Sequence, residues 1–282
     1  MELITNEVVI NEYSKKNYKI EYNENSTENI AVIYFSSNGL YYPNDIDTFS
    51  TAIVEKNRFE WSRNKISNAK KHIFVRDIFK QWYISGISKK NNTVNKVKEF
   101  LKAETEGYKV VTVGSSAGGY AAILFGILLK AEYVLSFAAQ FTLYPQIRKS
   151  NPNKDSVLFK HLNNSNYNNY YDLSNLINNN DTTIYYFCPS RCEIDRPQLQ
   201  AAESCKKVKI LKISSDKHGI PCTLPCLKTI INLDKNKLDN LFKHYEQKEI
   251  NFFYFSIKTS GLKTNISYFL KHTQKKIIKN YF

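Results

Sequence analysis

The stretch Lys109-Val-Val-Thr-Val-Gly-Ser-Ser-Ala-Gly-Gly-Tyr-Ala-Ala-Ile-Leu-Phe-Gly-Ile-Leu-Leu-Lys130 decides the fold of this chain. It begins with a short β-branched run, Val110 to Val113, which is typical of a buried strand. It ends with an apolar, alanine-rich run, Ala117 to Leu129, which predicts a buried helix. Between the two lies Gly114-Ser-Ser-Ala-Gly118, a match to the pattern G-x-S-x-G, in which the serine occupies a sharp turn from strand to helix.

The residue types around this turn favour a nucleophilic serine. Strand and helix backbones pass close together there, and Gly114 and Gly118 leave room for that approach. The hydroxyl then lies beside a helix N-terminus, where free N–H groups favour developing negative charge. A phosphate-binding turn is the alternative, but it would carry G-x-G-x-x-G or end in G-K-S/T, and neither is present. By register the predicted nucleophile is Ser116, and Ser115 is the variable residue.

Length and composition indicate a globular protein of one large domain, or a domain with an appendage. The chain has 282 residues, of which 42% are hydrophobic, enough for a sizeable core. The N-terminus is acidic and lacks the apolar segment of a secretory signal. No apolar run approaches the ~18 residues that span a membrane. We therefore expect a cytoplasmic location, with the inner face of the membrane as the alternative.

The charge is strongly positive and uneven. The formal net charge is +14, and residues 227–282 hold eleven lysines, no arginine and four acidic residues, a net charge of +7. Such a region predicts an anionic partner, which could be an acidic polysaccharide, a membrane surface, coenzyme phosphates or nucleic acid; a solvated lysine-rich surface is the alternative. Nucleic acid is disfavoured because the chain has no known binding motif and no arginine-rich face.

The cysteine pattern predicts no metal site and no disulfide framework. Five cysteines are an odd number, which fits a reducing compartment. Cys188/Cys192 and Cys222/Cys226 form two C-x3-C pairs, a spacing that matches zinc ribbons poorly. We interpret them as buried or free thiols.

Strand and helix patterns alternate along the chain, which predicts an α/β fold with a doubly wound, mostly parallel sheet. Residues 1–28 show local alternation, with Val8 and Ile10 in one stretch and residues 18–22 in another, and favour one or two edge strands. Residues 141–180 are polar and Asn-rich, which indicates a cap or lid inserted over the sheet. We expect a catalytic domain over 1–232 and a basic, mainly helical extension over 233–282. The remaining expected strands are 29–35, 71–76, 110–113, 132–137, 182–188 and 208–214, and the expected helices are 44–56, 93–104, 117–129, 197–206, 233–247 and 263–280.

Ligands of such sheets bind at the carboxyl ends of the strands, so polar residues that follow strands are the candidates. Asp195 follows one expected strand and His218 follows the next. With Ser116 they give the chain order Ser, Asp, His of the hydrolase triad. His218 would take the serine proton as general base, and a buried carboxylate would orient the imidazole. Asp195 is the predicted acid and Glu193 the alternative.

An acyl-transfer site also needs two N–H donors for the oxyanion. One is expected from Ala117, directly after the nucleophile. The other is expected from the loop after the strand 29–35, at Ser37 or Asn38, although the same residues also fit an ordinary turn.

These motifs together resemble α/β-hydrolase-like proteins encoded among bacterial surface-polysaccharide genes, and are similar in outline to capsular polysaccharide O-acetyltransferases. The resemblance covers most of residues 29–231 and leaves 232–282 and the Asn-rich insertion without a counterpart. It implies a Ser-His-Asp enzyme that moves an acetyl group to or from a sugar hydroxyl, with no bound cofactor and with acetyl-CoA as co-substrate in the transferase case. The residues that carry it are Tyr34-Phe-Ser-Ser-Asn-Gly39, Arg76-Asp-Ile, Trp82-Tyr83, Gly86, Gly114-Ser-Ser-Ala-Gly-Gly119, Leu135-Ser-Phe-Ala-Ala-Gln140, Asp195 and Lys217-His-Gly219.

Other functions stay open from the sequence. A general esterase or thioesterase would have the same triad, and a hydrophobic lid would favour it. A catalytically inactive glycan-binding or capsule-assembly protein is a third reading. Residues 264–281 have an amphipathic pattern, which indicates either docking on the domain or contact with an anionic membrane surface.

Overall fold

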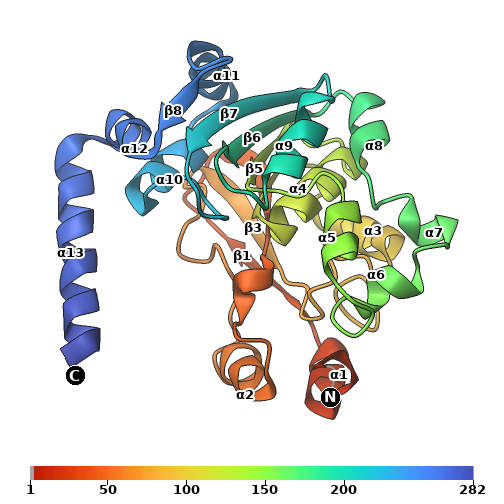
Figure 1. Cartoon of the computed structure of the whole chain (residues 1–282). Helices are drawn as coiled ribbons and strands as arrows, with labels where there is room; N and C mark the ends of the chain where they lie inside the picture. The colour runs from red at the N-terminus through yellow and green to blue at the C-terminus, as the bar shows by residue number, and fades with distance from the viewer. Residues whose placement is uncertain (1–2, 282) are drawn as a thin grey trace.

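The computed structural model describes the backbone of residues 3–281 and the side chains of residues 4–271. In the described part an eight-stranded sheet has the order β1-β3-β2-β4-β5-β6-β7-β8 (Figure 1). β1 runs antiparallel to β3, and the other neighbouring strands are parallel. The predicted mostly parallel, doubly wound sheet is confirmed.

The strands are β1 (Tyr18–Tyr22), β2 (Glu28–Phe35), β3 (Ala69–Val75), β4 (Lys109–Ser115), β5 (Tyr133–Phe137), β6 (Thr183–Pro189), β7 (Val208–Ser214) and β8 (Glu249–Asn251). The longer helices are α1 (Glu7–Tyr13), α3 (Val94–Glu104), α4 (Ala117–Leu128), α9 (Arg196–Glu203), α10 (Leu224–Ile231), α11 (Lys235–His244), α12 (Phe252–Ser260) and α13 (Leu262–Tyr281). The short helices are η1 (Leu3–Thr5), η2 (Asn38–Leu40), α2 (Ile46–Phe49), η3 (Ser50–Glu55), α5 (Tyr144–Lys149), α6 (Ser156–Lys160), α7 (Ser165–Asn168) and α8 (Ser174–Asn178).

Two hydrophobic cores lie on the two faces of the sheet. Successive side chains of a strand point to opposite faces, and β2 follows this rule: Ile33 and Phe35 belong to one core, while Val32 and Tyr34 belong to the other. Helices α3, α4 and α9 contribute to the first core, and α10, α11 and α12 contribute to the second. All residues of α4 except Leu128 are buried, which explains why its sequence lacks a polar face.

The Asn-rich segment 141–180 forms the four short helices α5 to α8 and is fastened to the first core. Buried apolar side chains hold it there, among them Phe141, Leu158 and Tyr171. The amide Oε1 of Gln198 on α9 accepts hydrogen bonds from the backbone N–H groups of Phe141 (2.7 Å) and Thr142 (3.1 Å). The polar residues of this segment therefore lie mainly on its outer side, and its few apolar residues attach it to the first core.

The C-terminal region 233–282, expected to be mainly helical, also adds a strand to the sheet. In β8, Ile250 pairs with Ile213 of β7. Leu238 and Phe242 of α11 are buried in the second core. The first part of the expected extension is therefore continuous with the main domain.

The expected edge strand in residues 1–28 is confirmed as β1, over residues 18–22. Two other predictions near the N-terminus need correction. Val8 and Ile10 lie on helix α1 rather than on a strand, with the side chain of Asn6 accepting a hydrogen bond from the Val8 N–H (2.9 Å). The expected helix 44–56 is divided into α2, capped by Asp45, and the π-helical turn η3.

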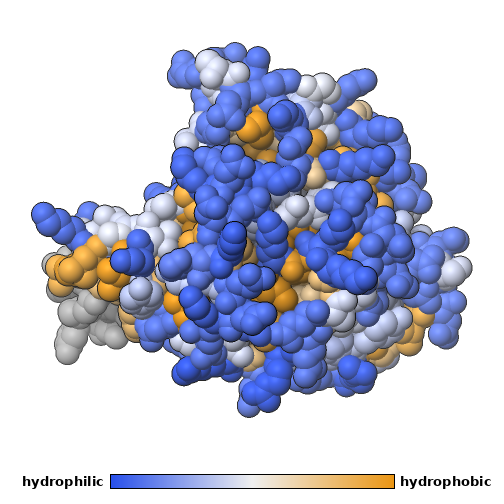
Figure 2. All heavy atoms as spheres, turned by 90° about the horizontal axis from the view of Figure 1, so that it is seen from above, coloured by the Kyte–Doolittle hydropathy of each residue, from blue (hydrophilic) through white to orange (hydrophobic). Residues whose placement is uncertain are grey.

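The surface is mostly hydrophilic in the view from above (Figure 2). α13 stands apart from the sheet at the left of Figure 1, and apolar atoms lie on the projection at the left of Figure 2. Within the described residues, no helix is long and apolar enough to cross a bilayer.

Candidate active site

The turn between β4 and α4 places Ser116 in a strained conformation. Its backbone angles are φ 55° and ψ −125°, outside the regions that L-residues normally adopt. The flanking glycines make the turn sterically feasible. A Cβ on Gly114 would lie 2.0 Å from the carbonyl oxygen of Gly118, and a Cβ on Gly118 would lie 2.2 Å from that of Phe35. No side chain fits at either position.

Ser116, His218 and Asp195 form a continuous hydrogen-bonded chain. The Ser116 Oγ lies 2.7 Å from His218 Nε2. The other ring nitrogen, Nδ1, lies 2.9 Å and 3.0 Å from the two carboxylate oxygens of Asp195. The Asp195 side chain is fully buried, whereas that of His218 is 28% exposed. This arrangement can draw a proton from the serine hydroxyl while the carboxylate stabilises the imidazolium.

The structure separates the candidate acids. Asp195 lies at the N-terminus of α9, and its buried carboxylate contacts the partly exposed ring of His218. Glu193, the alternative, is exposed. Among the acids with described side chains, only Asp195 pairs with the His218 ring.

Two N–H groups near the nucleophile are available for an oxyanion. The backbone N–H groups of Ala117 and Asn38 donate no hydrogen bond within the described part of the chain. Asn38 also lines the same cavity as Ser116 and His218. Ser37 has to be removed from the predicted donors, because its N–H already donates to the Glu60 carboxylate at 2.6 Å.

Glu60 holds the turn that presents Asn38, and nothing in the sequence singled it out. Its carboxylate accepts hydrogen bonds from both the N–H and the Oγ of Ser37 (2.6 and 3.1 Å). The Ser37 Oγ in turn accepts from the Gly39 N–H at 3.0 Å. Burial raises the pKa of Glu60. Glu60 lies 23 residues from Ser37, in a segment without a catalytic motif, so only the folded chain reveals the contact.

A second buried acid, Asp77, shapes another wall of the site. Its carboxylate accepts hydrogen bonds from the N–H groups of Phe79 (3.0 Å), Gln81 (2.8 Å) and Tyr83 (2.8 Å). Burial raises the pKa of Asp77 to about 6. These bonds fix a loop in which Lys80, Trp82 and Tyr83 all have positive φ. Of the residues Arg76-Asp-Ile and Trp82-Tyr83 noted in the sequence, Trp82 lines the cavity that contains Ser116, and Asp77 holds the loop behind it.

Ser116 opens into a cavity of about 630 Å³, which we call the catalytic cavity. Its lining includes the cations Lys80, Lys149 and Lys154, two of which come from the Asn-rich segment. The Lys80 Nζ donates to the Tyr41 carbonyl and to the Asn44 Oδ1 (2.6 Å). Burial lowers the pKa of Lys80 to about 8. The same lining includes one acid, Asp155, and apolar side chains such as Phe79, Trp82 and Ile194. The cavity therefore has a mixed polar and apolar lining with an excess of positive charge.

The site also contains a group of side chains with metal-ligand chemistry, Cys192, Asp195 and His218, whose ligand atoms lie within 4.8 Å of one another. The His218 Nδ1 and the Asp195 carboxylate are already hydrogen-bonded to each other. Burial raises the pKa of Cys192, which favours the thiol over the metal-binding thiolate. The geometry thus fits a hydrogen-bonded triad better than a metal centre.

No protein-family model matches the sequence, and the curated proteins include no significant sequence match. Solved structures do match the fold. A structure of the capsule O-acetyltransferase of Neisseria meningitidis serogroup A aligns with a TM-score of 0.51 at 15% identity, over 82% of this chain and 90% of that one. The same enzyme with caged gadolinium aligns with a TM-score of 0.50 at the same identity and coverage. A mutant of that enzyme in complex with CoA aligns with a TM-score of 0.48 at 16% identity, again over 82% and 90% of the two chains.

At these identities the likeness concerns the fold alone. Three features of the structure agree with this fold: the strand order, the sharp turn at Ser116 between β4 and α4 (the elbow), and the helices on both faces of the sheet. The chain therefore has an α/β-hydrolase-like fold.

Proposed function

We propose that the protein is a serine-dependent acyl-ester enzyme that acts on carbohydrate. The favoured reaction is transfer of an acetyl group from acetyl-CoA to a hydroxyl of a bacterial surface polysaccharide. The alternative reaction at the same site is hydrolysis of such acetyl esters. The observation that carries this proposal is the hydrogen-bonded chain from Ser116 through His218 to the buried Asp195, beside two free N–H groups. The resemblance of the sequence motifs to capsular O-acetyltransferases supports the choice of acyl group and acceptor.

The first half of the reaction would load the acyl group onto the enzyme. His218 Nε2 removes the proton of Ser116 while its Oγ attacks the acyl carbonyl carbon. The carbonyl oxygen becomes an oxyanion that accepts hydrogen bonds from the N–H groups of Ala117 and Asn38. Collapse of this intermediate breaks the bond to the leaving group, which takes the proton from the His218 imidazolium. Asp195 stabilises that imidazolium throughout and keeps its own charge.

The second half would release the acyl group to an acceptor. A sugar hydroxyl gives its proton to His218 and attacks the acyl-serine, and the Ser116 Oγ then recovers the proton. In hydrolysis a water molecule takes the place of the sugar. The three lysines that line the catalytic cavity support an acceptor that carries acidic groups.

A fluorophosphonate probe tests the proposal directly, because it reacts only with an activated serine. We expect intact mass to show one adduct on the parent protein and none on Ser116→Ala. Ser115→Ala is the matched control and should still react, since Ser115 precedes the elbow. A folded parent protein that stays unmodified would contradict the proposal.

A second measurement distinguishes transfer from hydrolysis. Release of free CoA from acetyl-CoA is measured with and without an added acidic oligosaccharide. Release that requires the oligosaccharide and produces its acetyl ester is the expected result. Equally fast release without any sugar would leave hydrolysis as the activity.

We also propose that the protein works in the cytoplasm at the inner face of the membrane, as a peripheral member of capsule assembly. The support is a cluster of exposed apolar side chains with lysines beside them on α12 and α13. The exposed apolar residues are Phe253, Tyr254, Leu262, Ile266 and Leu270. The nearby lysines are Lys258, Lys263 and Lys271. Apolar burial combined with attraction to anionic headgroups is the usual basis of interfacial binding.

A further inference from the structure

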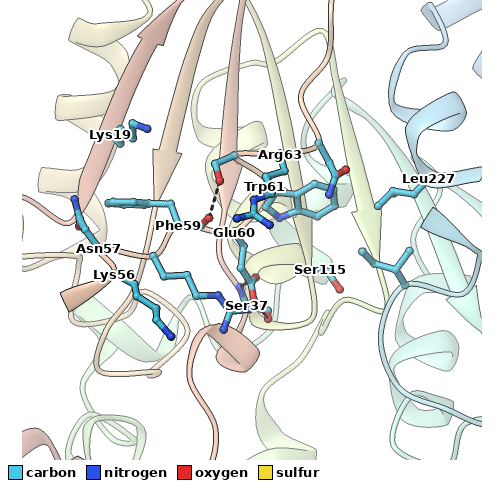
Figure 3. A pocket seen from close by; sticks show the side chains of 14 residues that line it. Lys19, Ser37, Lys56, Asn57, Phe59, Glu60, Trp61, Arg63, Ser115 and Leu227 are labelled. Carbon is cyan, nitrogen blue, oxygen red and sulfur yellow. Dashed lines mark hydrogen bonds between the residues drawn. The ribbon is translucent and has the colours of Figure 1, made fainter. Parts of the chain in front are cut away.

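A second cavity has a volume of about 910 Å³, larger than that of the catalytic cavity. Figure 3 shows the side chains that line it. We call it the rear cavity. It is formed mainly by residues 56–64, with Lys19 of β1 on one wall and Leu227 of α10 on the other. Its volume is in the range of cavities that bind small molecules. The proposed acyl-transfer chemistry does not use it.

The rear cavity is strongly cationic. Lys19, Lys56, Arg58 and Arg63 line it. Lys19 is paired with Glu21 at 2.6 Å, but the other three form no ion pair with any residue whose side chain the structure describes. Glu60 is the acid of the lining, and its carboxylate is bound by Ser37. The Glu60 charge also interacts with Arg58. The lining thus has four cations and one acid, an excess of positive charge.

The segment that carries these cations is held in place by contacts on both sides. The Arg58 N–H donates to the Ala52 carbonyl (2.9 Å), and the Arg58 carbonyl accepts from Arg76 Nη1 (3.0 Å). The guanidinium of Arg76 lies 4.3 Å from the centre of the Phe59 ring. Trp61 donates from Nε1 to the Phe35 carbonyl at 3.2 Å. A binding surface fixed in advance loses little conformational entropy when a ligand arrives.

The two cavities share a wall made of the same three turns. Ser37 lines the rear cavity and Asn38 the catalytic one; Ser115 lines the rear cavity and Ser116 the catalytic one. The turn after β7 does the same, since Ile220 lines the rear cavity and His218 the catalytic cavity. A molecule in the rear cavity would therefore lie against the back of the catalytic turns.

We propose that the rear cavity is a second binding site, which takes an acidic carbohydrate segment. The unpaired Lys56, Arg58 and Arg63 would bind its carboxylate or phosphate groups. The apolar Phe59 and Trp61 give a partly apolar lining, and Asn57 and Asn64 offer amides for hydroxyl groups. The choice of a carbohydrate rests on the proposed function, whereas the choice of an anion rests on the charges alone.

The test measures binding rather than activity. Calorimetry is done on Ser116→Ala protein with hexagalacturonic acid as the acidic probe and maltohexaose as the neutral one, at low and at physiological salt. We expect the acidic hexamer to bind, its affinity to fall with added salt because exposed charges are screened, and maltohexaose not to bind. Because catalysis is not needed, failure of this test is distinguishable from failure of the proposed acyl transfer.

Charge reversal locates the site. Lys56→Glu with Arg58→Glu should weaken binding of the acidic hexamer at least tenfold. The matched control is Lys102→Glu with Lys206→Glu, which removes the same charge from two exposed lysines that line neither cavity. Equal weakening by both pairs would mean nonspecific attraction and would overturn the proposal.

A further titration, with a nucleotide, tests whether the rear cavity binds phosphate groups of a nucleotide rather than an acidic carbohydrate. Adenosine 3′,5′-bisphosphate is titrated into the same protein and the same variants. The proposal expects it to bind more weakly than the acidic hexamer. Binding of the bisphosphate that depends on Lys56 and Arg58, together with no binding of the acidic hexamer, would overturn the assignment to carbohydrate.

Discussion

Glu60 lies outside the hydrogen-bonded chain of the active site, yet it fixes one of its donors. The carboxylate holds Ser37 through two hydrogen bonds, and the next residue along the chain, Asn38, offers its N–H to the catalytic cavity. In the proposed reaction, a buried acid that orients a turn in this way is a positioning residue, and it would act on the oxyanion through the backbone.

Removal of the Glu60 carboxylate should slow the chemical step. We expect Glu60→Ala to lower kcat about tenfold or more with little change in KM, because loss of a well-placed oxyanion donor costs on the order of 10²-fold or more. Hydrolysis of 4-nitrophenyl acetate measures both constants. Glu60→Gln should recover most of kcat, since its amide oxygen can still accept from the Ser37 N–H. A rise in KM alone would show that Glu60 serves substrate binding instead.

Lys80 should give the site a pH-dependent preference for anions. Burial lowers its pKa to about 8; Asp77 and Glu60 act against that shift, and Arg58 adds to it. Below pH 8 the ammonium is charged and attracts an anion, and above pH 8 it is neutral.

The measurement is the ratio of kcat/KM for an anionic ester, mono-4-nitrophenyl succinate, to that for 4-nitrophenyl acetate. The ratio cancels effects common to both esters, such as titration of the base. It should fall as the pH rises through about 8. Lys80→Met should give a lower ratio that does not change with pH. A parent ratio independent of pH would exclude this role of Lys80.

At the scale of elements, the unit of β4, the elbow and α4 depends on close backbone approach. A Cβ at Gly114 would lie 2.0 Å from a backbone oxygen, which cannot move without shifting α4. Gly107 offers a matched comparison: its φ is +78°, but nothing lies within 4 Å of the added Cβ.

Gly114→Ala should therefore destabilise the protein far more than Gly107→Ala. We expect about 3 kcal/mol or more for the first, as for severe overpacking, and about 1 kcal/mol for the second, as for a residue strained only by its φ. Thermal unfolding followed by circular dichroism measures both. Similar melting temperatures for the two variants would show that the elbow can relax.

The same unit shows how much the sequence could reveal. β4 and α4 were predictable because each has a continuous local pattern, a β-branched run and then a long apolar run. The order of Ser116, Asp195 and His218 was predictable because each follows an expected strand, and parallel strands end at one edge.

Other elements carried no local signal. β8 has three residues, too few for any periodic pattern, and joins the sheet only because Ile250 meets Ile213. In α1, Val8 and Ile10 are exposed and Val9 is buried, so the alternation that favoured a strand came from residues facing solvent. The contact of Glu60 with Ser37 likewise depends on tertiary structure.

At the scale of the whole molecule, α13 is joined to the domain at its first turns. The side chain of Asn265 is buried and donates to the carbonyls of Ser256 (3.1 Å) and Gly261 (2.7 Å), while its Oδ1 accepts from Thr223 (2.6 Å). The amphipathic pattern over 264–281 is described only as far as residue 271; the side chains of the rest lie outside the described part. In the described turns, Ile266 and Leu270 are exposed, by 48% and 61%.

Association with an anionic membrane should depend on these side chains. We expect the protein to co-sediment with phosphatidylglycerol vesicles and not with phosphatidylcholine vesicles, and the double variant Ile266→Asp, Leu270→Asp to stay in solution. Thr264→Asp, an exposed polar position of the same helix, is the control and should co-sediment like the parent. If the parent protein stays in solution with both kinds of vesicle, the membrane proposal is wrong.

The positive φ of Ser116 should affect how all possible substitutions at this position rank, both by protein abundance and by activity. Its conformation costs about 1–3 kcal/mol for a residue with a Cβ, more than the roughly 1 kcal/mol by which glycine would favour the unfolded chain. Scored by cellular abundance, glycine at position 116 should therefore rank above serine. If the same variants are ranked by acyl-transfer activity, only serine at position 116 should be active. The two rankings should disagree strongly at this position, because the proposed reaction needs a hydroxyl on a residue whose backbone conformation costs folding free energy.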